Sequence, residues 1–175
     1  MSSSPVVWVD GEPVSALPLP DRGLDFGDGL FETLLVRDGE PLFLSLHMDR
    51  LSAGLELLSF PDCLATARAQ LTACAAELGD IKWAAMRLTV TRGSGPRGYA
   101  APQNSTPRMV ITAAALEQDR SQFAAPLELG WADLRWSSQP HLAGIKHLNR
   151  LEQVLVANQA RDARWDEAVV LDQQG

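Results

Sequence analysis

The feature that most constrains the fold of this chain is a series of short strand-like runs that enclose helical stripes of apolar residues. The run at 6–9 is followed by Asp10-Gly11, and the run at 30–36 is followed by Asp38-Gly39. Asp-Gly is a common two-residue hairpin turn, so both places predict antiparallel hairpins. Further strands are predicted at 83–91, 109–114, 127–136 and 168–171.

Apolar residues at helical spacing predict three helices between these strands. The first stripe is Leu44, Met48, Leu51, Leu55 and Leu58, and the second is Leu64, Ala67, Leu71, Cys74, Ala75 and Leu78. Pro61 ends the first helix and Gly79 ends the second, and a third helix is predicted from His147 to about Ala163. Interleaved strands and helices with hairpin connections favour an α+β fold over a doubly wound parallel sheet.

Composition excludes several classes of protein. The chain has 175 residues, 46% of them hydrophobic, which is enough to bury a core. Its formal charge is -7 and its basic residues are scattered, so a nucleic-acid surface is not expected. No apolar stretch is long enough for a membrane span, and the N-terminus lacks a secretory pattern. Cys63 and Cys74 are predicted to be reduced core residues, as in a cytoplasmic protein.

Lys146 is the residue whose sequence surroundings most favour a catalytic role. It follows a short apolar, glycine-containing stretch and precedes Leu148, Leu151 and Leu155 at helical spacing. A lysine at such a junction can point into a cleft, where loss of water favours the neutral amine that attacks carbonyl groups. The alternative is a solvated surface lysine before a helix.

Other sequence patterns give weaker indications of a functional site. Residues 93–98 satisfy G-x-G-x-x-G, but a loop follows instead of the helix that a dinucleotide site requires. The arginines of this loop are interpreted as facing an anion, with a solvated hairpin tip as the alternative for Arg92. His47, His141 and His147 lack partners at metal spacing, and no G-x-S-x-G serine elbow occurs.

Four blocks, in order along the chain, carry a resemblance to a known family. They are the run from Asp21 to Thr33, the run from His47 to Leu51, the run from Thr91 to Tyr99, and "LAGIKHLNRLEQVL" around Lys146. Together they resemble the 4-amino-4-deoxychorismate lyases, which belong to the fold-type IV pyridoxal-phosphate enzymes with the D-amino-acid and branched-chain aminotransferases.

The resemblance implies a domain organisation and a cofactor. Residues 1–120 would form the smaller N-terminal α+β domain, and residues 121–175 the beginning of a larger domain that binds pyridoxal 5'-phosphate. The chain is expected to be truncated, with the acid that pairs with the pyridine nitrogen and much of the phosphate cup lying beyond residue 175. A homodimer is also implied.

Site residues are implied in the same way. Lys146 would form the imine with the cofactor and act as the catalytic base, and Arg50 would bind the phosphate. Thr33 would relay a proton to the leaving group, while Phe31, Arg97 and Tyr99 would contact the substrate. From the residues alone, Thr33 is equally explained by its β-propensity, and Arg50 by a surface ion pair on its own helix.

The implied reaction converts 4-amino-4-deoxychorismate into 4-aminobenzoate and pyruvate, a step toward folate. The flanks of Lys146 and the loop at 97–99 resemble the lyases more than the aminotransferases. Two alternatives stay open: a fold-type IV aminotransferase, and a cofactor-free fragment that serves only in binding or dimerisation.

Overall fold

The computed structural model describes residues 6–14, 16–117 and 125–175, which divide into two compact units. The first unit comprises residues up to 119 together with the short segment Ile145–Leu148. The second comprises residues 120–144 and 149–175. The boundary lies beside the expected one at about residue 120, and the assignment of a smaller and a larger domain stays a prediction.

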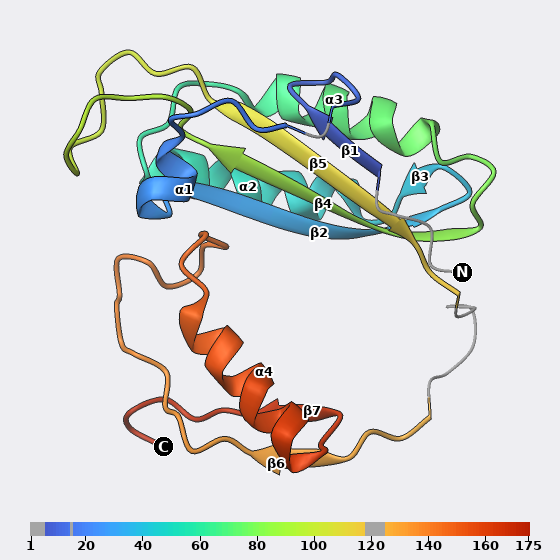
Figure 1. The fold of residues 1–175 in the computed structure, drawn as a ribbon, viewed down its shortest axis with the longest axis vertical. Coiled ribbons are helices and arrows are strands. Elements are labelled where there is room, and N and C mark those ends of the chain that lie inside the picture. Colours follow the sequence, from blue (N-terminus) through green and yellow to red (C-terminus); the bar gives the residue numbers. More distant parts are fainter. Residues whose placement is uncertain (1–5, 15, 118–124) are drawn as a thin grey trace. The chain divides into compact units, whose positions relative to one another are not determined.

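A five-stranded antiparallel sheet forms the centre of the first unit, in the order β1-β5-β4-β2-β3 (Figure 1). The strands are β1 (Val6–Val9), β2 (Gly29–Arg37), β3 (Glu40–Pro41), β4 (Trp83–Thr91) and β5 (Arg108–Ala115). β2 pairs with β4 along its whole length, from Gly29 opposite Thr91 to Arg37 opposite Trp83. The predicted strand at 83–91 is confirmed, and so is the α+β class.

Two helices, α2 (Leu44–Leu57) and α3 (Leu64–Ala76), cover one face of this sheet (Figure 1). Successive side chains of a strand point to opposite faces, so every second residue of β2 meets the helices. Leu30, Leu34 and Val36 are accordingly almost fully buried with Met48 of α2 and Leu71 of α3. Burial of these apolar stripes fixes how α2 lies on β2, and both predicted helices are confirmed.

One further helix, α1 (Arg22–Phe26), was not predicted because a single turn carries no apolar period. Its ends nevertheless have ordinary caps. The side chain of Asp21 accepts a hydrogen bond from the backbone N–H of Gly23 at 2.9 Å. Gly27 closes the other end in the left-handed conformation, with φ of 68°.

The predicted helix start at His147 is wrong, because residues 145–148 are not helical and His147 instead forms an isolated antiparallel bridge with Leu30 of β2. The N–H of Phe31 donates to the carbonyl of Lys146 at 2.9 Å, and the N–H of Leu148 donates to the carbonyl of Gly29 at 3.1 Å. These bonds satisfy the edge of β2 that faces away from β4. Helix α4 therefore begins only at Leu151.

The second unit contains α4 (Leu151–Ala163) and the short strands β6 (Leu129–Trp131) and β7 (Glu167–Val169). β6 is much shorter than the predicted strand at 127–136. It pairs with β7 in parallel. Trp165 packs so closely on Gly130 that an added Cβ would lie 2.0 Å from the indole ring, which explains the absence of a side chain there.

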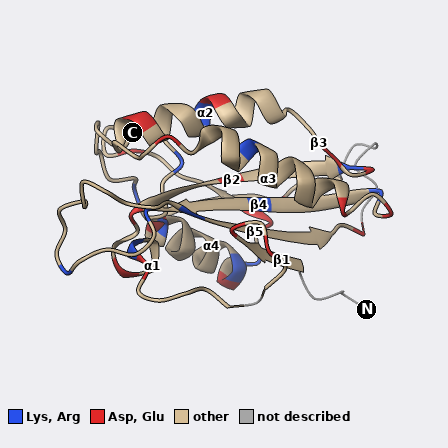
Figure 2. Ribbon diagram, turned by 90° about the horizontal axis from the view of Figure 1, so that it is seen from above, with Lys and Arg blue, Asp and Glu red and all other residues tan. Residues whose placement is uncertain are grey.

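Charge is spread over both units. Figure 2 shows Lys and Arg on several separate elements, so no helix or strand of the described residues carries a continuous basic stripe. No helix within the described ranges is long and apolar enough to cross a membrane.

Candidate functional site

Strand β2 holds the residues of the candidate site through two consecutive positions, Phe31 and Glu32. Their side chains leave opposite faces of the sheet, because neighbouring residues of a strand alternate. Both are buried, at 8% and 1% exposed. A buried glutamate on a core-facing position requires partners, since an unpaired carboxylate is costly to bury.

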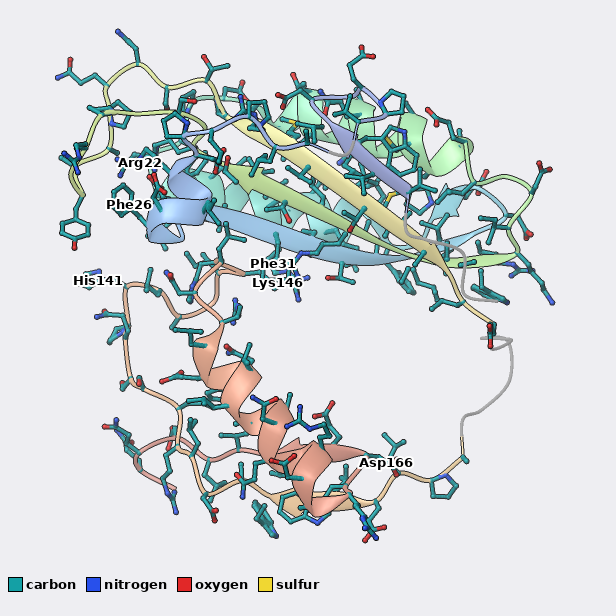
Figure 3. All side chains as sticks on the ribbon, in the orientation of Figure 1. Arg22, Phe26, Phe31, His141, Lys146 and Asp166 are labelled. Carbon is teal, nitrogen blue, oxygen red and sulfur yellow. The ribbon has the colours of Figure 1, made fainter. Side chains whose placement is uncertain are left out.

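Phe31 lies beside Lys146. Besides the backbone bond that joins the two residues, the Lys146 Nζ lies 4.6 Å from the centroid of the Phe31 ring. Figure 3 shows the two side chains as neighbours. The guanidinium carbon of Arg87 lies 3.8 Å from the same centroid, so two cationic groups contact one aromatic ring.

Glu32 binds Arg50 and His47, both on α2. The Arg50 Nε donates to Oε1 of Glu32 at 2.7 Å, and Nη2 donates to Oε2 at 2.5 Å. The Nδ1 of His47 lies 2.7 Å from the same Oε2. The alternative of a surface pair within the helix is therefore wrong for Arg50, because its partner lies on β2.

The electrostatics of this cluster favour charged side chains. Burial raises the pKa of Glu32, but hydrogen bonds from Arg50 and His47 outweigh it, so the pKa lies below its usual value. The hydrogen bond to Glu32 raises the pKa of Arg50 despite some burial. Glu32 is thus a carboxylate and Arg50 a guanidinium near neutral pH.

Lys146 and Arg50 contact adjacent residues of β2, Lys146 at the Phe31 ring and Arg50 at the Glu32 carboxylate, on opposite faces of the sheet. An amine and an exposed guanidinium are two of the groups that pyridoxal phosphate requires, one for its carbonyl carbon and one for its phosphate. The residues present therefore fit that cofactor. Among the described residues, no group of His, Cys, Asp and Glu could hold a metal ion.

Thr33 and Arg87 lie together on the sheet face opposite the helices. They are directly paired across β2 and β4, and both are exposed. Arg87 was not identified from the sequence, although its position in the strand indicates an outward-facing polar side chain. It occupies the polar position of an alternating strand, on the side that carries Phe31 and Thr33.

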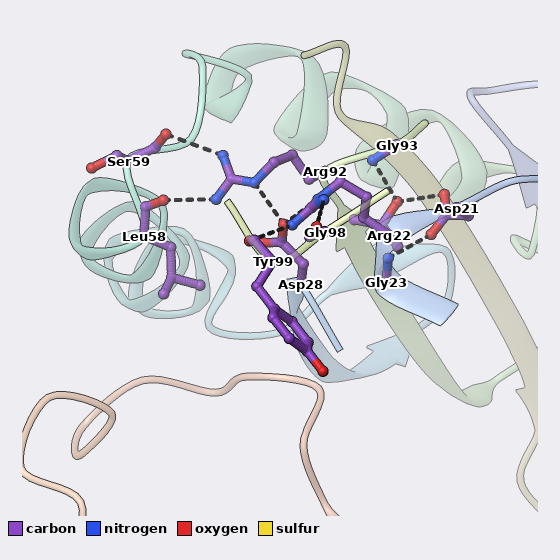
Figure 4. Close-up of polar contacts among 11 residues, drawn as sticks. Asp21, Arg22, Gly23, Asp28, Leu58, Ser59, Arg92, Gly93, Gly98 and Tyr99 are labelled. Atoms are coloured by element: carbon purple, nitrogen blue, oxygen red, sulfur yellow. Dashed lines mark hydrogen bonds and ion pairs between the residues drawn. The ribbon is translucent and has the colours of Figure 1, made fainter. Parts of the chain in front are cut away.

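The loop at 93–99 is held by a network of buried arginines (Figure 4). Asp28 Oδ2 accepts from Nε of Arg22 at 2.8 Å and from Nε of Arg92 at 2.9 Å. Arg22 also donates to the carbonyls of Gly98 and Tyr99, both at 2.9 Å. Because Arg22 is only 3% exposed, these bonds fix the backbone of the loop's end.

Arg92 therefore faces the carboxylate of Asp28 inside the protein and is not a solvated hairpin tip. Its guanidinium is buried and donates to the carbonyls of Leu58 and Ser59. Arg97 and Tyr99, the two residues expected to contact substrate, are exposed on the loop. The Tyr99 ring packs edge-on against Phe26 at 5.4 Å between centroids.

Comparison with known proteins shows the family of the chain that carries this site. Residues 29–175 match the model of the amino-transferase class IV family. The chain belongs to this family. The match includes β2, α2 and the segment with Lys146, which together make up the candidate site.

Individual relatives agree. A crystal structure of 4-amino-4-deoxychorismate lyase from Pseudomonas aeruginosa is 42% identical with a TM-score of 0.84, over 97% of this chain and 62% of that one. Aminodeoxychorismate lyase of Vibrio harveyi is 34% identical over 95% of this chain and 61% of its own length. D-alanine aminotransferase of Listeria innocua is also 34% identical, over 89% of this chain and 54% of its own.

The family fold is the fold-type IV pyridoxal-phosphate enzyme fold, of which this chain covers a part. The expected fold class and the resemblance to the lyases are confirmed. The chain spans only about three fifths of the length of the lyases it matches.

Proposed function

We propose that this chain belongs to a pyridoxal-phosphate-dependent lyase that converts 4-amino-4-deoxychorismate into 4-aminobenzoate and pyruvate. The observation that supports it best is the placement of Lys146 and Arg50 against consecutive residues of β2. The relatives from Pseudomonas and Vibrio bear the name of this lyase.

Lys146 and Arg50 would hold the cofactor, Lys146 at the carbonyl carbon and Arg50 at the phosphate. When bound, pyridoxal phosphate supplies an electron sink for negative charge that develops on the amine-bearing carbon of the substrate. The backbone bond between Lys146 and Phe31 of β2 restricts where the Lys146 amine can reach, which is the positional requirement for a base.

The lyase reaction needs proton transfer at two places. A base removes the ring proton from the amine-bearing carbon, and the ring C–O bond to the enolpyruvyl group breaks as the ring becomes aromatic. The leaving group then takes up a proton and becomes pyruvate. We assign the base to Lys146 and a proton relay to Thr33, whose hydroxyl-bearing side chain is exposed on β2.

Substrate carboxylates need cationic partners. Arg97 and Tyr99 were expected to contact the substrate and keep this role as a proposal, with Phe31. Arg87 joins them because it lies against the Phe31 ring and opposite Thr33. A guanidinium in this position offers a fork of donors that suits a carboxylate.

An aminotransferase is the second candidate, and the likeness to the D-alanine aminotransferase of Listeria innocua supports it. Both reactions use the same lysine and phosphate ligands, so these residues do not separate them. A cofactor-free binding or dimerisation module is the third alternative. The homodimer and the cytoplasmic location also stay predictions.

The products of the protein with aminodeoxychorismate test the proposal. We expect 4-aminobenzoate and pyruvate in equal amounts without any keto-acid acceptor. A requirement for 2-oxoglutarate, or faster turnover of D-alanine, would favour the aminotransferase. A protein that takes up no pyridoxal phosphate would favour the binding module.

A further inference from the structure

The guanidinium of Arg50 offers two edges to an oxyanion, and the structure uses only one of them. The edge formed by Nε and Nη2 binds both oxygens of Glu32. Such paired contacts fix the orientation of the whole planar group, because two parallel bonds leave it no freedom to rotate.

The second edge of Arg50, formed by Nη1 and Nη2, points elsewhere. In the part of the chain that the structure describes, Nη1 makes no hydrogen bond or ion pair with another residue. The Arg50 side chain is 45% exposed, whereas that of Glu32 is 1% exposed. One edge of the guanidinium therefore binds a buried carboxylate, while almost half of the Arg50 side chain is exposed.

Glu32 is itself held firmly. Strand β2 pairs with β4 both before and after Glu32 along the chain. The Oε2 atom of Glu32 also contacts Nδ1 of His47. His47 and Arg50 lie one helical turn apart, so both reach the carboxylate from the same side of α2. The buried carboxylate thus has partners on both oxygens.

We propose that Glu32 is a positioning residue that presents the free edge of Arg50 as a preset fork for the phosphate of the cofactor. The inference rests on the proposed function, in that it takes pyridoxal phosphate as the ligand. A free arginine loses much rotamer freedom when it binds an anion, and one already fixed by Glu32 loses less.

An opposite role for Glu32 is physically reasonable and makes the inference testable. Its negative charge weakens the attraction between Arg50 and a phosphate dianion. If Glu32 acted only as a counter-charge, its neutralisation would strengthen phosphate binding. If it positions Arg50, neutralisation weakens binding.

Dissociation constants of pyridoxal phosphate and of pyridoxal, which lacks the phosphate, separate these roles. They are measured by absorbance with the cofactor-free protein, so no turnover is needed. For Glu32→Gln we expect pyridoxal phosphate to bind about 5- to 20-fold more weakly and pyridoxal to bind within about twofold of wild type. Glu32→Gln added to Arg50→Lys should weaken binding no further, since both act through one contact.

Two matched variants serve as controls. Glu56→Gln makes the same change at an exposed position of α2 and should leave both constants unchanged. His47→Ala, which keeps the Arg50–Glu32 pair, should cause a smaller loss for pyridoxal phosphate alone, and His47→Asn should restore part of it. These variants also decide the matter should Glu32→Gln fail to fold.

Tighter binding of pyridoxal phosphate by Glu32→Gln would overturn the inference in favour of a counter-charge. An equal loss for both ligands would overturn the inference in favour of a structural role for Glu32. If wild type bound pyridoxal phosphate no better than pyridoxal, the proposed phosphate site would fall as well. Tight wild-type binding with an unaffected Glu32→Gln would instead refute the inference alone.

Discussion

Replacement of Asp28 by alanine should destabilise the first unit strongly. One oxygen of Asp28 accepts hydrogen bonds from two arginines that are only 3% and 4% exposed. Removal of the carboxylate leaves two buried guanidinium groups without a counter-charge. Breaking a buried ion pair costs about 3–5 kcal/mol, and we expect a value in this range for Asp28→Ala.

Hydrogen exchange is the assay that suits a chain with two units. Amides of β2 and β4 should exchange only when the first unit opens globally, so their exchange free energies report its stability. Asp28→Asn, which keeps an acceptor but loses the charge, should cost about 1.5–3 kcal/mol. The control Asp49→Ala removes an exposed aspartate of α2 and should stay within about 0.5 kcal/mol.

A loss below about 1 kcal/mol for Asp28→Ala would refute this reasoning, because that is the range of exposed ion pairs. It would mean that the arginines keep their positions through their bonds to backbone carbonyls alone. Loss of stability equal to that of Asp49→Ala would have the same meaning.

Three further predictions concern single groups. Lys146→Ala should abolish turnover and the adduct that borohydride reduction fixes to the protein, and a peptide map that found the adduct on Lys82 would contradict the assignment. Glu32 has a lowered pKa in the folded state, so its stabilisation relative to Glu32→Gln should be complete above its ordinary value of 4.5 and vanish as pH falls through the lower folded value, as urea denaturation at several pH values can measure. Burial raises the pKa of Cys63 and Cys74 to about 11. Both thiols should therefore react with Ellman's reagent at pH 8 only in denaturant. Rapid reaction of the native protein would show that the two thiols are not buried.

The periodic parts of the fold were predictable from the sequence. The stripe on α2 and the alternation along 83–91 depend on which residues are apolar, and burial against one core enforces both periods. The strand-like pairing of 145–148 was not predictable. Leu148 shares a helical spacing with Leu151, and only the distant edge of β2 decides that its N–H bonds to Gly29 instead.

The candidate site was predictable in its parts but not in its contacts. Lys146 and Arg50 stand out through their motifs, whereas Glu32 lies among leucines on a core-facing strand position and gives no signal of a partner on α2. Arg92 shows the reverse difficulty. It lies in a glycine-rich, apparently exposed loop, yet the carboxylate that binds it is 64 residues earlier in the chain.

Ile145–Leu148 hydrogen-bonds to the edge of β2, whereas the residues on either side of this segment belong to the second unit. The first unit is therefore not one continuous stretch of the chain. A chimera of two related enzymes joined near residue 119 would pair a β2 from one parent with an edge segment from the other. A protein that ended before residue 145 would leave the N–H of Phe31 and the carbonyl of Gly29 unpaired at the edge of β2. Strands of other molecules can pair with such an edge, which leads to aggregation. Recombination within this family should therefore succeed more often when both segments come from the same parent.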